Sequence, residues 1–143
     1  MLVANIGQRI VKNIFIDTIL FFLMADTKKY KWHKVADSKE GLFFNENNLL
    51  QTVVAGKAIC LSKKEEVIMA CAARCPHAGG IMAEGFIDAM GNIVCPLHRY
   101  KYSLLNGRNV SGEGYFLKTY PVETRTDGVF VGIEENNLLG WLK

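Results

Sequence analysis

The stretch that decides the fold is CPHAGGIMAEGFIDAMGNIVCPLH, residues 75–98. It begins with Cys75-Pro76-His77 and ends with Cys95-Pro96-Leu97-His98, so one small unit occurs twice: a thiol, a proline, then an imidazole two or three residues later. Each proline fixes the backbone φ angle and removes a competing N–H donor. Two such units on facing loops would present two sulfur and two nitrogen atoms to one site, a donor set suited to a metal.

The spacing alone leaves the nature of the metal open. Zinc bound by two cysteines and two histidines is one interpretation. Zinc fingers, however, keep the cysteines together on one knuckle and the histidines on a helix, whereas here each unit holds one of each. A third interpretation is that the thiols are simply buried and the histidines simply exposed, but paired spacings with paired prolines rarely arise by accident.

Length and composition limit the classes of protein that remain. The chain has 143 residues, which is enough for one domain, and its 50% hydrophobic and 22% charged residues are typical of a globular core. A formal net charge of +3 is too small to indicate nucleic acid as the main partner. The chain has only three histidines, which excludes mechanisms that need many histidine ligands.

From residue 28 onward the pattern predicts short strands and no long helix, which indicates an all-β domain. Ala55-Gly56 separates two β-rich runs and predicts a hairpin. Later turns are expected at Asn106-Gly107 and Asp127-Gly128, two dipeptides suited to positive φ angles. We expect strands around Tyr30 and Trp32, then at Gln51–Val54, Lys57–Leu61, Val67–Cys71, Gly85–Asp88, Asn92–Cys95, Leu117–Glu123 and Val129–Ile133. Residues 134–143 form either a tail or one turn of helix.

The first 24 residues differ from the rest, and we treat 1–24 as a separate segment before a domain at 25–143. Polar residues recur there at helical spacing, followed by the apolar run Ile19–Met24. Six apolar residues are far fewer than the roughly 20 of a membrane span. A secretory signal is also disfavoured, because Asp17 interrupts the apolar stretch and no small-x-small cleavage site follows. The segment is therefore either a docked amphipathic helix or sequence upstream of a true start at Met24.

The paired motifs, CPH and CPLH, resemble the Rieske 2Fe–2S proteins, whose signature is C-x-H and C-x-x-H on two facing loops. The likeness extends to Tyr102, four residues after His98, and to the segments GGIMAEG, NG and LKTYPVE, so it covers roughly residues 28–133. It implies an antiparallel β-sandwich with a small cluster-binding subdomain of two facing loops, at about residues 71–105.

The same resemblance implies the ligands of the metal centre. One iron of a single 2Fe–2S cluster per chain would be held by Cys75 and Cys95, and the other by His77 and His98. Tyr102 stands where the family places a tyrosine that donates to a cysteine sulfur; a core aromatic is the alternative role. Histidine ligation raises the reduction potential to about −150 to +300 mV, against about −400 mV for plant-type ferredoxins.

Some positions depart from the pattern of the family. The high-potential branch braces its loops with a disulfide, but Gly80 and Leu97 stand at those positions. The same branch has a serine where Tyr100 stands. With these features missing we expect a potential in the lower half of the range. The glycine that usually follows the second histidine is replaced by Arg99, which places a cation beside the cluster edge.

Two further differences bear on the surroundings of the site. Gly112 and Gly114 replace the usual prolines of a later loop, which we expect to be looser over the cluster. Cys60 and Cys71 match no ligand position, and we expect buried, reduced thiols on strands, as in a cytoplasmic protein. His33 is expected to be an ordinary strand histidine.

The functional prediction is a non-catalytic electron carrier. An oxygenase would also need two histidines for a mononuclear iron, and only His33 is left. No nucleotide or flavin motif is present. The resemblance implies a cytoplasmic ferredoxin that carries one electron from a flavin-dependent reductase to an oxygenase, with no nucleic acid and no membrane span. The alternatives are a small subunit of a larger reductase such as nitrite reductase, or a zinc-binding structural module.

Overall fold

The computed structural model describes residues 28–135. The N-terminal segment 1–24 and the tail after residue 135 lie outside these residues, so the expectations for them stay predictions. Strands and two short 3₁₀ turns are the regular elements of residues 28–135, which confirms the all-β class. The elements are β1 (Tyr30–Ala36), η1 (Lys39–Gly41), β2 (Leu49–Val54), β3 (Lys57–Lys64), β4 (Val67–Ala72), η2 (Met82–Glu84), β5 (Phe86–Ile87), β6 (Asn92–Val94), β7 (Lys101–Ser103), β8 (Thr119–Tyr120), β9 (Val122–Arg125) and β10 (Gly128–Glu134).

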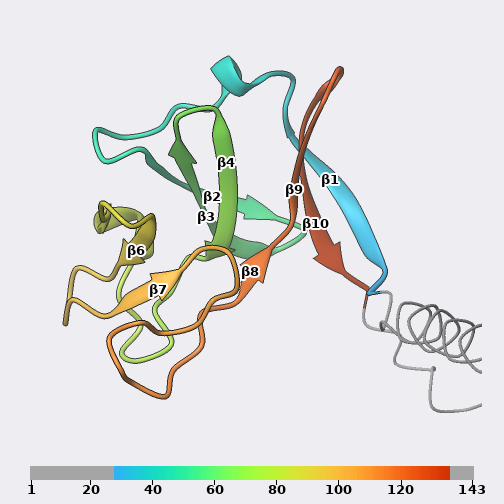
Figure 1. The fold of residues 1–143 in the computed structure, drawn as a ribbon. Helices are drawn as coiled ribbons and strands as arrows, with labels where there is room; N and C mark the ends of the chain where they lie inside the picture. Colours follow the sequence, from blue (N-terminus) through green and yellow to red (C-terminus); the bar gives the residue numbers. More distant parts are fainter. Residues whose placement is uncertain (1–27, 136–143) are drawn as a thin grey trace, which may run out of the picture.

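The strands form three antiparallel sheets, in the orders β1-β10-β9, β2-β3-β4-β8 and β5-β6-β7. In Figure 1 the four-stranded sheet lies between the β1-β10-β9 sheet and the small sheet that contains β6 and β7. The antiparallel sandwich expected from the sequence is confirmed. The small third sheet lies within the range expected for the cluster-binding subdomain, whose limits at about 71 and 105 stay a prediction.

The four-stranded sheet separates two apolar cores, and β3 contributes to both. Ile59 and Leu61 pack into the core shared with β10, while Cys60, which alternates with them, packs toward the small sheet. This alternation follows from the two-residue period of a strand. Four consecutive residues of β3, Ile59 to Ser62, are therefore buried, as expected for a strand covered on both faces.

Turn chemistry fixes the register of the first hairpin. Ala55 and Gly56 both have positive φ angles, 49° and 73°, the conformation of the two central residues of a type I′ turn. The pairing of Val54 with Lys57 follows directly, and continues along β2 and β3 to Leu49 and Ser62. The hairpin expected at Ala55-Gly56 is confirmed.

Two features of the fold differ from the expectation. The single strand expected at Leu117–Glu123 is wrong: Pro121 divides it into β8, which pairs with β4, and β9, which pairs with β10. Proline has no N–H to donate to a ladder, so the chain changes sheets at this residue. The strand β7 was not expected, because three residues are too few to show a period. Among residues 28–135 no helix is long and apolar enough to cross a bilayer.

Candidate metal centre

The first loop, residues 75–80, is held in a tight turn by its own backbone. The N–H of Gly79 donates to the carbonyl oxygen of Cys75 at 2.9 Å, and the N–H of Cys75 donates to the carbonyl oxygen of Gly80 at 2.8 Å. Gly79 has a φ of +72°, which costs glycine little and other residues more. The loop therefore fixes the direction of the Cys75 side chain locally, without help from the rest of the fold.

The second loop, residues 95–100, repeats this geometry. The N–H of Arg99 donates to the carbonyl oxygen of Cys95 at 3.1 Å, and the N–H of Cys95 donates to that of Tyr100 at 2.9 Å. Arg99 takes the positive φ of the turn, 63°. This explains why a glycine suits the position, and it means that Arg99 holds a backbone conformation unfavourable for a residue with a Cβ.

The two loops face each other across Gly80. A Cβ on this glycine would lie 2.8 Å from the Sγ of Cys95 and 3.1 Å from the Cγ of Leu97. The positions where a disulfide braces other Rieske proteins are thus neighbours here, and neither is a cysteine. A glycine is also needed at position 85, because the backbone there lies close to that of Val94. An added Cβ would meet the carbonyl oxygen of Val94. At Gly79, by contrast, nothing lies within 4 Å of an added Cβ, so this glycine serves the positive φ angle.

At this junction the structure brings together the two predicted thiol ligands and, as a second pair, the two predicted imidazole ligands. The thiols of Cys75 and Cys95 are close enough to shift each other's pKa, and both residues are almost fully buried, with exposures of 3% and 1%. The imidazoles of His77 and His98 lie with ring centroids 4.8 Å apart and planes at 73°. His77 is half-buried, whereas His98 is exposed. Two sulfurs therefore occupy the inner end of the site and two imidazoles occupy its outer end.

The surroundings of the two thiols shift their pKa values in opposite directions. Burial raises the pKa of the Cys75 thiol, but hydrogen bonds from the Tyr102 hydroxyl and the backbone N–H of His77 outweigh it, so the pKa is lowered overall. For Cys95, burial and the neighbouring Cys75 raise the pKa, against the backbone N–H groups of Leu97 and His98. N–H and O–H groups aimed at both sulfurs favour thiolates, the form that binds metal.

Tyr102 fills both roles that the sequence left open. Its residue exposure is 0%, so it is a core aromatic, and its hydroxyl lies 3.3 Å from the Sγ of Cys75. Burial and the contact with Cys75 both raise the pKa of Tyr102, so the hydroxyl keeps its proton and is the donor to a thiolate sulfur. β7 places this ring, because Tyr102 pairs with Ile93 of β6 on the inner face of the small sheet.

The donor set consists of two thiols and two imidazoles, which fits a centre that takes two like donors on each iron. Within residues 28–135 no group of three or more His, Cys, Asp or Glu side chains is arranged to hold one metal ion. Tetrahedral zinc needs four donors around one ion, whereas a Rieske centre asks for two donors per iron.

Two aromatic residues enclose His77. The ring centroid of Tyr100 lies 4.4 Å from that of His77, and the centroid of Tyr115 lies 5.0 Å away. Tyr115 comes from the loop between β7 and β8, and the sequence analysis did not identify it. The signal available was that loop itself, which was noted for Gly112 and Gly114, but nothing in the sequence aims its tyrosine at a histidine 38 residues earlier.

The remaining cysteines and His33 are not part of the site. Cys60 and Cys71 stand directly opposite each other on β3 and β4; both are free, with exposures of 0%. The neighbouring thiol of Cys60, together with burial, raises the pKa of Cys71 well above its usual value, so it is an inert thiol. The expectation of buried, reduced cysteines is confirmed. His33 lies on β1 opposite Val131, as expected for a strand histidine.

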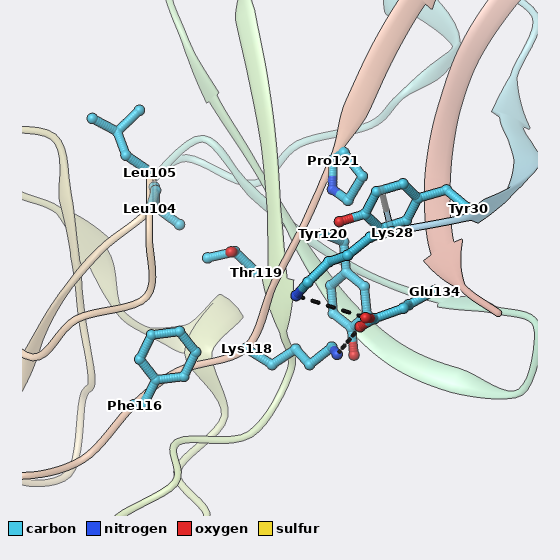
Figure 2. A pocket seen from close by; sticks show the side chains of 10 residues that line it. All are labelled: Lys28, Tyr30, Leu104, Leu105, Phe116, Lys118, Thr119, Tyr120, Pro121 and Glu134. Carbon is cyan, nitrogen blue, oxygen red and sulfur yellow. Dashed lines mark hydrogen bonds and ion pairs between the residues drawn. The ribbon is translucent and has the colours of Figure 1, made fainter. Parts of the chain in front are cut away.

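One cavity lies away from the predicted ligands. Its volume is about 320 Å³, and Figure 2 shows its lining by Tyr30, Phe116 and other residues. Two lysines line it, but both pair with Glu134: Lys28 at 3.6 Å and Lys118 at 3.1 Å. Glu134 balances one of the two lysine charges, and none of the four predicted ligands lines this cavity, so the loops remain the candidate site.

Comparison with known proteins agrees with this geometry. A 3-phenylpropionate/cinnamic acid dioxygenase ferredoxin subunit of Photorhabdus laumondii is 29% identical over 63 residues, which are 43% of this chain and 60% of that protein. The match thus spans about three-fifths of the relative's length. A ferredoxin solved in complex with the oxygenase of carbazole 1,9a-dioxygenase is 21% identical, with a TM-score of 0.61 over 73% of this chain and 95% of that one.

A protein assigned as the NADH-dependent nitrite reductase small subunit of Mycobacterium tuberculosis is 16% identical, with a TM-score of 0.66 over 75% of this chain and 98% of that one. At these identities the solved structures establish the fold alone. The family model described as Rieske [2Fe-2S] domain matches residues 31–121. This range is well over half of the chain and includes both loops. The chain therefore belongs to the Rieske 2Fe–2S domain family.

Proposed function

We propose that this protein is a one-electron carrier whose 2Fe–2S centre is held by Cys75 and Cys95 on one iron and His77 and His98 on the other. The observation that carries the proposal is the placement of the four side chains, with two thiols at the inner end and two imidazoles side by side at the surface. When bound, such a centre accepts and releases a single electron. Two neutral imidazoles in place of two thiolates leave it less negative, which raises its potential.

The protein's own residues tune this site through hydrogen bonds. The Tyr102 hydroxyl and the backbone N–H groups of each loop point at the sulfurs. Donors of this kind stabilise negative charge on sulfur and favour the reduced state. The loops contribute no disulfide and no serine hydroxyl at the positions the high-potential branch uses. We therefore place the potential in the lower half of the Rieske range.

The surface around the imidazoles suits brief contact with a partner. Leu97 is 57% exposed and lies beside His98 at the tip of the second loop. Pro76, Ala78 and Arg99 are also exposed, while Tyr100 is half-buried. A small apolar patch with one cation supports a weak complex that separates quickly after electron transfer. Arg99 also gives the tip a positive charge that attracts an acidic docking surface.

We propose an oxygenase as acceptor, a flavin-dependent reductase as donor and the cytoplasm as location. The support is the naming of the Photorhabdus relative as a dioxygenase ferredoxin subunit, the solved ferredoxin–oxygenase complex, and four free cysteines. The fold is shared with nitrite reductase small subunits, which makes a reductase subunit the second candidate. Gel filtration of the protein with its neighbouring gene products separates the two: a carrier elutes alone, whereas a subunit co-elutes with its large partner.

Substitution of single ligands tests the assignment of the centre. His98→Ala and Cys75→Ala should both lose iron and acid-labile sulfide, because each removes a donor that no neighbour replaces. His33→Ala and Cys71→Ala are the matched controls, since they remove the same chemical groups outside the site. Retention of the full iron and sulfide content in Cys75→Ala would rule out the proposed ligand set.

A further inference from the structure

We propose that Tyr115 is a positioning residue that covers the imidazole of His77, so that His98 alone is open to solutes and redox partners. The inference rests on the proposed function, because it concerns access to the two histidine ligands. The motif gives His77 and His98 equivalent places, but their surroundings give them different roles. One imidazole is enclosed by protein, and the other forms the contact with the outside.

The enclosure is built from three rings in mutual contact. His77 lies 4.4 Å from Tyr100, with planes tilted by 31°, and 5.0 Å from Tyr115, with planes at 61°. The two tyrosines lie 5.9 Å from each other. The distances of 5.0 and 5.9 Å are within the range of favourable aromatic pairs, and 4.4 Å is at its short limit. His77 thus packs at a tilt against the ring of Tyr100 and edge-on against the ring of Tyr115.

His98 lacks a comparable enclosure. Its ring meets His77 at 4.8 Å and lies 6.4 Å from Tyr100, and no aromatic contact with Tyr115 occurs in this part of the structure. The residue is exposed, and so are its neighbours Leu97 and Arg99. The open side of the site is therefore the side of His98.

The loop that carries Tyr115 is anchored at both ends, so its position over His77 is defined. At one end the Oγ of Ser111 accepts the N–H of Lys101 at 2.8 Å. At the other end the N–H of Leu117 donates to the carbonyl oxygen of Gly107 at 2.9 Å. Between these anchors the segment makes its aromatic contacts with the first loop (the orange loop leading into β8 in Figure 1).

The consequence is a one-sided route between the centre and its partner. A partner that approaches the tip meets His98, Leu97 and Arg99, whereas Tyr115 separates it from His77. One electron then passes to the oxidised centre of an acceptor protein through the His98 edge, with no bond made or broken. The docking surface is accordingly centred on the second loop.

Chemical modification of the holoprotein tests this inference. Diethyl pyrocarbonate acylates the unprotonated outer nitrogen of an imidazole, and peptide mass spectrometry assigns each rate to its residue. In the unaltered protein His98 should react about two to ten times faster than His77. This factor corresponds to the energy of one aromatic pair, which must be broken before the reagent reaches His77. Tyr115→Ala should raise the His77 rate by a similar factor and leave the His98 rate unchanged. Tyr115→Phe should keep the original ratio, because it retains the ring.

Two results would overturn the inference. Equal rates for His77 and His98 in the unaltered protein would show that neither is covered. An unchanged His77 rate in Tyr115→Ala would show that another group covers it. The electron paramagnetic resonance (EPR) spectrum of each reduced sample is recorded first. A preparation without the signal of the centre counts against the proposed function, whereas a normal signal with equal rates counts only against the role of Tyr115.

Discussion

Replacing Tyr102 by phenylalanine removes one hydroxyl from the inner end of the site and changes little else. The ring is fully buried between the small sheet and the four-stranded sheet, and phenylalanine keeps its packing. What is lost is the contact of 3.3 Å between the hydroxyl and the Sγ of Cys75. Because an added electron makes the sulfur more negative, this hydrogen bond is stronger in the reduced state. Its loss should therefore lower the midpoint potential.

The size of the shift follows from the energy of the hydrogen bond. A bond to a charged acceptor contributes about 1.5–3 kcal/mol, and the long distance to sulfur places this one at the lower end. If about 1 kcal/mol of it is gained only on reduction, the potential falls by about 40 mV, since a tenfold change in a one-electron equilibrium corresponds to about 59 mV.

Protein-film voltammetry measures this shift directly. Tyr100→Phe is the matched control, because its hydroxyl makes no hydrogen bond to a ligand sulfur within residues 28–135, and its potential should stay unchanged. Both variants should keep their full iron content. A Tyr102→Phe potential equal to that of the unaltered protein, with an intact EPR signal, would refute the argument that Tyr102 donates to the ligand sulfur.

Three further predictions concern the loops and turns that hold the site. Arg99→Gly should stabilise the protein by up to about 1 kcal/mol in chemical denaturation, because it relieves the positive φ of 63°, whereas Arg99→Ala should not; equal effects would contradict this. Gly85→Ala should unfold the small sheet or prevent cluster assembly, since its Cβ would meet the carbonyl oxygen of Val94; a fully loaded, equally stable variant would contradict it. Asp88→Ala should cost about 1–3 kcal/mol, because the carboxylate accepts the N–H groups of Met90 and Asn92. Burial raises the pKa of Asp88, but these hydrogen bonds lower it overall, so the stabilisation is present above the ordinary aspartate pKa and is lost as pH falls through the lowered value. Denaturation of Asp88→Ala should therefore depend less on pH between about 5 and 2, and an unchanged pH profile would exclude this role.

The fold was predictable where local chemistry determines it. The Ala55-Gly56 turn and the runs beside it fixed the first hairpin, because positive φ angles and strand propensity act over a few residues. The end of β8 at Pro121 was missed, although proline supplied the signal. The sequence does not show that two sheets meet at that residue. β7 was missed because its register depends on β6 rather than on its own three residues.

The candidate site follows the same division. The four proposed ligands stand out in the sequence because each loop repeats one local motif that fixes its own backbone geometry. The loop anchored near Ser111 could not be placed, since its path depends on contacts with Lys101 and Gly107. The ring of Tyr115 over His77 is therefore a tertiary feature. The positive φ of Arg99 was only partly predictable. The glycine that the family usually has at this position indicates a positive φ, whereas an arginine does not.

The central claim is that two imidazoles bind one iron while two thiolates bind the other. Pulsed EPR of the chemically reduced protein tests it most directly, because nitrogen bound to a paramagnetic iron gives its own hyperfine couplings. The account predicts a mean g value below that of a four-cysteine centre and couplings from two histidine nitrogens, both lost in His98→Ala. A reconstituted protein without iron, or a signal without nitrogen coupling, would contradict it.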